Sequence, residues 1–315
     1  MNKSSGSRIP RPFAYVLAFV AGLAMSLQAH INGELGVALG SGIVAATLSF
    51  GGGVILLGIA ALASARIREG LRAIRRAIAS QQTSWMFTLA GAAGAAFVLS
   101  QSTVAPVLGL GTFTVAFVCG LTVGGLVMDR FGIGPAGHKP VTLLRLVGAF
   151  LGVSAVVITT VGSTWTQPMS LGILVPVICG VGVSWQQAAN GRLTAVGQNA
   201  WATTLINFSV GFALLFGAAA IILSVTRPVL DFPANPWLYV GGPVGIVFIA
   251  IASIVVRHIG ILVYGLCATT GQLVSALAFD AFAPSGATVS VALIAGVVVV
   301  AAGASLASLS GLRRK

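Results

Sequence analysis

Residues 26–35 of the chain read SLQAHINGEL, and residues 184–193 read SWQQAANGRL. Five of these ten positions are identical. At the same separation of 158 residues, further matches pair Phe50, Gly53, Leu56 and Leu57 with Phe208, Gly211, Leu214 and Leu215. At a separation of 151 residues, a second block pairs Gly91, Gly94, Phe97, Ser102, Gly109, Gly120, Asp129 and Phe131 with Gly242, Gly245, Phe248, Ser253, Gly260, Gly271, Asp280 and Phe282. The sequence therefore contains an internal duplication, a construction typical of membrane transporters.

The composition indicates an integral membrane protein. Hydrophobic residues make up 57% of the sequence, charged residues only 7%, and the mean hydropathy is +1.02, so polar side chains are too few to cover a water-soluble surface. A helix needs about 20 apolar residues to cross the hydrocarbon core. Ten apolar stretches are predicted, at 13–38, 42–64, 83–102, 106–128, 140–162, 168–194, 199–225, 236–256, 260–281 and 287–310.

The lysines and arginines predict the orientation of these helices. If the N-terminus is cytoplasmic, sixteen of the 17 basic residues fall on the cytoplasmic side and only Arg227 falls outside. The sixteen are Lys3, Arg8, Arg11, Arg66, Arg68, Arg72, Arg75, Arg76, Arg130, Lys139, Arg145, Arg192, Arg257, Arg313, Arg314 and Lys315. By the positive-inside rule, both termini are expected in the cytoplasm. Because the net charge of +12 is gathered in short loops, it indicates topology and not nucleic-acid binding.

The duplication and the orientation together predict the fold class. Residues 1–162 and 163–315 each hold five of the predicted helices. Since five is odd, the second copy enters the membrane from the opposite side. We therefore expect an all-α integral membrane bundle of ten transmembrane helices, arranged as two inverted five-helix repeats. Such pairs are the usual basis of alternating access.

The duplicated motif carries a polar seam on two predicted helices. Gln28 and Asn32 in the first repeat, like Gln186 and Asn190 in the second, are four residues apart and so lie on one helix face. One interpretation is that these amides line a substrate path. The other is that they join the repeats by interhelical hydrogen bonds, worth about 1 kcal/mol per contact. The sequence leaves both open.

Glu34 is the acid set deepest within a predicted span, about one turn from the end of its helix. A carboxylate inside the bilayer is costly, so Glu34 either meets water at the helix end or serves as a proton carrier or a counter-charge for a cation. Its counterpart in the second repeat is Arg192, which predicts an electrically asymmetric seam. We include Gln28, Asn32, Glu34, Gln186, Asn190 and Arg192 in the candidate substrate path.

The remaining polar residues are interpreted as structural. Asp129 and Asp280 end predicted helices, and the first is expected to cap a turn or to pair with Arg130 or Arg145. His30 lies two residues before Asn32 and so faces away from the seam. The basic segment at 66–76 is amphipathic, either as a solvated cytoplasmic loop or as a helix on anionic headgroups.

The chain lacks the residue patterns of an enzyme. Cys119, Cys179 and Cys267 have no metal-ligand spacing, and no nucleophile is placed with a histidine and an acid. The glycines at Gly109 and Gly111 have no phosphate-loop lysine after them. We expect no catalysis, no cofactor and no metal. The expected partners are a small-molecule substrate and the lipid bilayer, without nucleic acid and with the oligomeric state open.

The motif also resembles a known family. Leu27-Gln28-Ala29, Asn32-Gly33, Leu35-Gly36 and Gly40-Ser41, followed by Phe50-Gly51, are similar to the YdcZ-type inner-membrane exporters of the drug/metabolite transporter superfamily. Asp129-x-Phe131-Gly132, with Arg145 and Gly148, resembles the end of that family's five-helix unit. In the second repeat Arg192, Thr194 and Gln198 replace Glu34, Gly36 and Gly40. The resemblance implies a ten-helix exporter in a bacterial inner membrane, with a central cavity between the repeats.

Two functions follow from these observations. The first is secondary active export of a small molecule by alternating access, with proton coupling open. The alternative is a membrane scaffold or sensor in which the polar seam only locks the helices. A water-accessible cavity around Asn32 and Asn190 would favour transport, and dry helix contacts would favour the scaffold.

Overall fold

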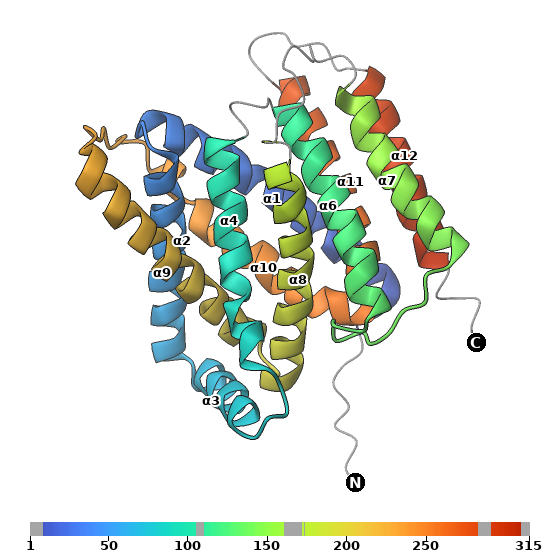
Figure 1. The fold of residues 1–315 in the computed structure, drawn as a ribbon, viewed down its shortest axis with the longest axis horizontal. Coiled ribbons are helices and arrows are strands. Elements are labelled where there is room, and N and C mark those ends of the chain that lie inside the picture. Colours follow the sequence, from blue (N-terminus) through green and yellow to red (C-terminus); the bar gives the residue numbers. More distant parts are fainter. Residues whose placement is uncertain (1–8, 105–109, 161–171, 173, 283–290, 310–315) are drawn as a thin grey trace.

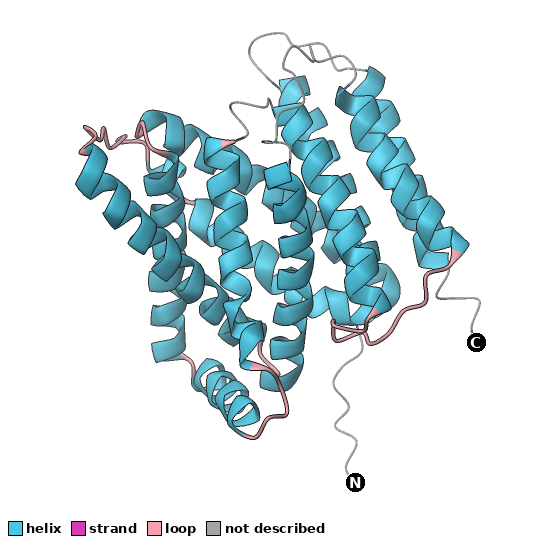
Figure 2. Cartoon of the chain, in the orientation of Figure 1, coloured by secondary structure: helices cyan, strands magenta, loops and turns pink. Residues whose placement is uncertain are grey.

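The fold is known from a computed structural model that describes residues 9–104, 110–160, 172, 174–282 and 291–309, and all regular structure in these ranges is helical (Figure 2). The first repeat contains α1 (Arg11–Ala38), α2 (Gly42–Ala63), α3 (Ala65–Ala79), the short η1 (Trp85–Leu89), α4 (Ala90–Thr103), α6 (Leu110–Arg130) and α7 (Leu143–Thr160). The second contains α8 (Leu174–Gly197), α9 (Ala200–Thr226), the short η3 (Pro236–Tyr239), α10 (Gly241–Ile259), α11 (Ile261–Phe282) and α12 (Val291–Leu309).

Each of the ten predicted stretches holds a helix in the described part of the chain. The prediction of a membrane protein is supported by α1, α2, α9 and the continuous Pro236–Ile259 segment, which are long and apolar enough to cross a bilayer. Shorter apolar helices occupy Trp85–Gln101, Leu143–Ala155, Ile261–Ser275 and Ile294–Leu309. Most differences from the predicted ends are small, because helix ends are set by turn and cap geometry and not by hydropathy.

The two halves of the chain are interleaved in space. Helix α1 packs on α10 and α11 of the second half, and its sequence counterpart α8 packs on α4 and α6 of the first. The counterparts α2 and α9 lie against each other at one edge of the bundle, and α7 and α12 at the other (Figure 1). The repeats are therefore units of sequence and do not form separate bodies.

Equivalent residues meet where the two halves cross. The rings of Phe50 and Phe208 are stacked at a tilt, with centroids 4.9 Å apart. Each ring lies where the glycine of the other repeat leaves room, since a Cβ added at Gly53 or Gly211 would come within 2.3 Å of the opposing phenylalanine. The matched Phe and Gly positions of the sequence thus form one contact of the interface.

One end of the bundle collects the basic residues. The start of α1, helix α3 and the ends of α6, α8 and α10 lie at this lower end in Figure 1, whereas Arg227 follows α9 at the other. Lys3, Arg8 and the three basic residues at 313–315 lie outside the described residues. The charge asymmetry needed for the predicted orientation is therefore present among the described residues.

Helix α3 packs one face on the second half of the protein. Ile67, Gly70 and Ile74 are buried, and a Cβ added at Gly70 would come within 2.8 Å of Asn199. The Asn199 side-chain amide donates a hydrogen bond to the Arg66 carbonyl at 3.2 Å. The arginines of the opposite face are exposed, so α3 is an amphipathic surface helix rather than an irregular loop.

A buried ion pair fixes the same end of the bundle. Asp129 at the end of α6 pairs with Arg145 at the start of α7. Of the roles predicted for Asp129, pairing with Arg145 is therefore confirmed. The Asp129 carboxylate also accepts from the backbone N–H groups of Ile261 (3.0 Å) and Leu262 (3.3 Å), so it caps α11 of the other repeat and not the turn that follows it. Burial lowers the pKa of nearby Lys139, and Asp129 opposes this shift. The side chain of Asp280 lies outside the described residues.

Candidate functional site

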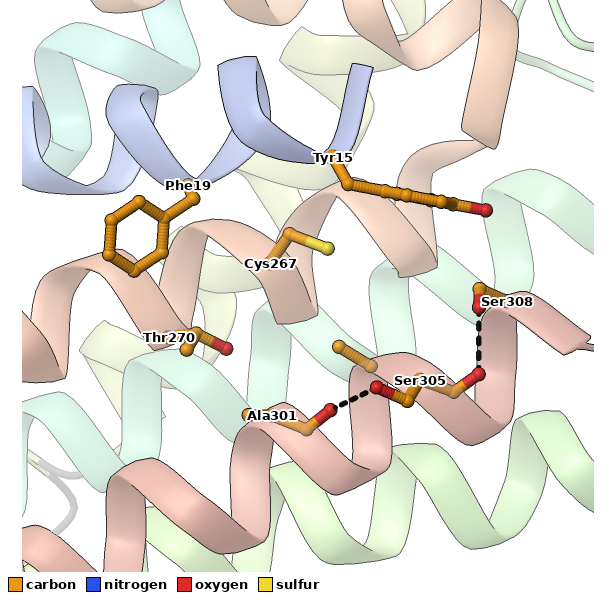
Figure 3. Close-up of a pocket in the computed structure, with 8 residues that line it drawn as sticks. Tyr15, Phe19, Cys267, Thr270, Ala301, Ser305 and Ser308 are labelled. Atoms are coloured by element: carbon orange, nitrogen blue, oxygen red, sulfur yellow. Dashed lines mark hydrogen bonds between the residues drawn. The ribbon is translucent and has the colours of Figure 1, made fainter. Parts of the chain in front are cut away.

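One hollow is a groove of about 220 Å³ between α1, α11 and α12 (Figure 3). Its lining residues are Tyr15, Phe19, Cys267, Thr270, Ala301, Ala304, Ser305 and Ser308. Its serine and threonine hydroxyls donate to carbonyls of their own helices: Thr270 to Leu266 at 2.9 Å and Ser305 to Ala301 at 2.9 Å. The serine and threonine donors are thus already used, and the groove contains none of the duplicated amides, so it is not taken as the candidate site.

A smaller hollow lies at the centre, between the two repeats. It encloses about 10 Å³, close to the space that one water needs. It is lined by Met25, Gln28, Phe50, Gly94, Phe97, Val98, Val183, Gln186, Phe208, Phe248 and Ile249. Three pairs in this lining, Gln28 with Gln186, Phe50 with Phe208 and Phe97 with Phe248, are repeat-equivalent residues. The sequence duplication thus builds a small cavity from both halves.

The second-repeat amides form a closed hydrogen-bonded cluster. Gln186 donates to the Asn207 side-chain oxygen at 3.2 Å, and the Asn207 amide donates to the Asn190 side-chain oxygen at 3.2 Å. All three side chains are at most 4% exposed. Asn207 on α9 therefore joins the two amides that the sequence motif places on α8. We call Gln186, Asn190 and Asn207 the closed cluster.

The equivalent side chains of the first repeat do not form such a hydrogen-bonded cluster. Ser49 on α2 occupies the position that corresponds to Asn207 at the separation of 158. Both side-chain polar atoms of Asn32 and the hydroxyl of Ser49 are buried without a hydrogen-bond partner among the described residues. Gln28 is also buried, and its amide faces the central cavity. We call Gln28, Asn32 and Ser49 the open cluster.

A glycine determines where the Asn32 amide lies. A Cβ added at Gly241 on α10 would be 2.1 Å from the Asn32 side-chain oxygen and 3.2 Å from the Ser49 hydroxyl oxygen. At the equivalent position of the first repeat, by the separation of 151, the chain has Ala90. Asn32 therefore occupies space on α10 that a methyl group fills in the other half.

Glu34 and Arg192 do not join the amides. The Glu34 side chain is 56% exposed and lies 3.3 Å from His30, which is 51% exposed, one turn earlier on α1. This exposure favours the interpretation in which Glu34 meets water at the helix end. Arg192 donates to the carbonyl groups of Gly132 (2.6 Å) and Ile133 (2.9 Å), so it holds the loop after α6.

No charged residue lines the central cavity in the part of the chain that the structure describes. Glu69 and Asp231 are exposed, and Asp129 is paired at the end of the bundle. The described residues also hold no group of three or more His, Cys, Asp or Glu side chains that would suit a metal ion. The lining of the cavity therefore consists of aromatic, aliphatic and neutral amide groups.

Two parts of the site were not predicted from the sequence. Four phenylalanines were matched between the repeats but not assigned to the site, although their pairing marked them: Phe50, Phe97, Phe208 and Phe248. Ser49 and Asn207 differ in type, so a search for identities passes over them. The signal that finds Ser49 and Asn207 is their position, one residue before the matched Phe50 and Phe208.

These features define a helical membrane protein with a cavity shared by two copies of one sequence unit. The model of the family described as "Putative inner membrane exporter, YdcZ" matches the chain twice, at residues 13–158 and 171–306. The chain belongs to this family of inner-membrane proteins, as its motifs had suggested. The search of the curated proteins gives no match.

The fold also occurs among solved structures. One of them, titled "Crystal structure of protein", is similar to this chain with a TM-score of 0.67, and the match covers 98% of this chain and 99% of the other. The two sequences are 18% identical over the match. The similarity therefore concerns the fold alone.

Proposed function

We propose that this protein is a secondary active exporter that moves a small molecule across a bacterial inner membrane by alternating access. In this proposal ten helices cross the membrane as two inverted five-helix repeats, at 1–162 and 163–315, and both termini are cytoplasmic. The family's description as an exporter and the charge asymmetry of the bundle support this arrangement.

The observation that carries the proposal is the central cavity lined by equivalent residues of both repeats. Gln28 and Gln186 face one small space, with Phe50 and Phe208 beside them. In an inverted pair, exchanging the conformations of the two halves opens the same space to the other side of the membrane. In this proposal the small central cavity is the space that such an exchange opens to either side.

A scaffold or sensor is the second candidate, and one observation favours it. Asn32 and Asn190 do not line the cavity but lie in dry contacts between helices, each 3% exposed. Dry contacts are expected if the seam serves only to hold the helices together.

The open cluster nevertheless supports transport over scaffolding. An amide that served only as an interhelical bond would have a partner, yet Asn32 has none among the residues that the structure describes. A buried polar group without a hydrogen bond costs about 1–3 kcal/mol. Such a cost is hard to explain in a static scaffold but is expected where a ligand or water completes the bonds in another state of a cycle.

The test begins with a search for ligands of the purified protein. Amines, nucleosides and amino acids are screened for thermal stabilisation, because a ligand that binds only the folded state raises the apparent stability. A ligand found in this way is then followed across proteoliposome membranes, with Gln28→Ala and Gln186→Ala as variants. Transport that both variants reduce is expected, and binding without any transport would favour the sensor.

The topology is tested separately by placing reporter tags at the two termini. Both tags are expected on the cytoplasmic side. Tags on opposite sides would be incompatible with an even number of crossings.

A further inference from the structure

We propose that Asn32 and Ser49 form the subsite that hydrogen-bonds the uncharged polar end of the transported molecule, and that Asn207 closes the equivalent place in the second repeat. This inference rests on the proposed function, because it assigns the chemistry of the ligand that the central cavity takes. The two amino acids lie on α1 and α2, next to the cavity residues Gln28 and Phe50.

The first step of the argument is the unused hydrogen-bonding capacity of the open cluster. The Asn32 amide offers two N–H donors and an oxygen acceptor, and the Ser49 hydroxyl can donate or accept. These atoms are buried without partners in the described part of the chain, and the Asn32 and Ser49 oxygens flank the same point on α10, at Gly241. A neutral group with both a donor and an acceptor, such as a carboxamide, satisfies them together.

The second step is the contrast with the closed cluster. Asn207 occupies the position of Ser49 and uses its own amide to satisfy Gln186 and Asn190. In the second repeat, the longer Asn207 side chain therefore satisfies the hydrogen bonds of the neighbouring amides. In the first repeat, a ligand would satisfy them. This assigns the polar end of the ligand to the first repeat and leaves the second as the supporting side.

The third step concerns charge. No charged side chain lines the cavity among the described residues, and the Glu34 and Arg192 side chains are directed to other partners. An ion entering this cavity would lose its hydration without gaining a counter-charge, at a large cost. Phe50, Phe97, Phe208 and Phe248 provide aromatic faces for the rest of the molecule. The ligand class is an uncharged, ring-containing molecule with an amide-like end.

The experiment uses the purified full-length protein and three probes of matched size: benzamide, benzoate and benzylammonium. Benzamide at millimolar concentration is expected to raise the melting temperature, and the two charged probes to leave it unchanged. Absence of a benzamide effect, or an equal or larger effect of a charged probe, would overturn the ligand class.

Two substitutions test the subsite itself. Ser49→Ala removes one hydrogen-bonding group with almost no change in shape and is expected to weaken benzamide binding about tenfold, the loss that one such bond corresponds to. Ser49→Asn is expected to fill the subsite and abolish binding, while raising the melting temperature of the ligand-free protein. The matched control Ser224→Ala, an exposed serine on α9 that bonds only within its own helix, is expected to retain the benzamide affinity.

The outcomes separate this inference from the proposed function. Unchanged benzamide affinity in Ser49→Ala would mean that Ser49 has a structural role only, even if transport of some other molecule is found. Binding that depends on Ser49 without any transport in proteoliposomes would retain the subsite and remove the exporter.

Discussion

The two repeats surround their amides with the same backbone but not with the same hydrogen bonds. A Cβ added at Gly91 would lie 2.0 Å from the Asn207 carbonyl oxygen, and one added at Gly242 would lie 2.3 Å from that of Ser49. The helices thus approach equally closely in both halves. The halves differ at two equivalent positions, Ser49 against Asn207 and Gly241 against Ala90. Asn207 bonds to both of its neighbours, whereas Ser49 has no partner among the described residues.

The largest effect on stability is expected from disrupting the close helix packing that the two halves share. Gly91→Val and Gly242→Val each place a side chain against backbone atoms of a neighbouring helix, and each should destabilise the protein by about 3 kcal/mol or more. Unfolding in detergent measures this loss. Gly52→Val on α2 is the control, because nothing lies within 4 Å of an added Cβ there. If only one of the two glycines proves sensitive, the equal packing of the two halves would be wrong.

A smaller effect is expected where the halves differ. Asn207→Ala leaves the buried amides of Gln186 and Asn190 without their partner and should destabilise the protein by about 2 kcal/mol. Ser49→Ala removes a hydroxyl that has no partner among the described residues, so stability should stay equal or rise slightly. Equal losses in the two variants, measured by the same unfolding transition, would contradict the distinction between open and closed clusters.

The comparison is sharpened by converting one half into the other. Gly241→Ala places a methyl group 2.1 Å from the present position of the Asn32 oxygen, so this side chain must move. In the Ser49→Asn background, the displaced Asn32 amide should form a hydrogen bond with the new asparagine at position 49, as Asn190 does with Asn207. A double-mutant cycle is expected to show a favourable coupling of about 1 kcal/mol between the two substitutions. Additive effects would mean that Gly241 does not direct Asn32.

The smallest effect is expected at the charged position of the motif. Glu34 is exposed and pairs with His30 on its own helix, so Glu34→Gln should change stability by less than about 0.5 kcal/mol. The pH dependence of transport in proteoliposomes should also stay the same. A transport rate that loses its pH dependence in this variant would restore Glu34 as the proton carrier.

Much of the fold was predictable from local properties of the chain. The predicted stretch at 42–64 and the observed α2 at Gly42–Ala63 nearly coincide, because a long apolar run between a glycine-rich break and a basic segment has few other structures in a bilayer. The burial of the seam was also predictable. Gln28 and Asn32 lie on one helix face, and the structure buries both. The role of Arg192 was not predictable, since its partners are carbonyl groups about 60 residues away in the chain.

The sequence by itself determined the duplication, the membrane environment, the number of apolar stretches and the asymmetry of basic charge. The apolar stretches depend on local composition, and the duplication and the charge asymmetry depend on the order of residues along the chain, so none of these properties requires the helices to be placed in space. Only the tertiary structure decided that Gln28 and Gln186 face one cavity, that Asn207 closes one cluster and that Ser49 leaves the other open. A hydrogen bond forms only over about 3 Å, so its presence depends on how helices distant in the sequence approach one another.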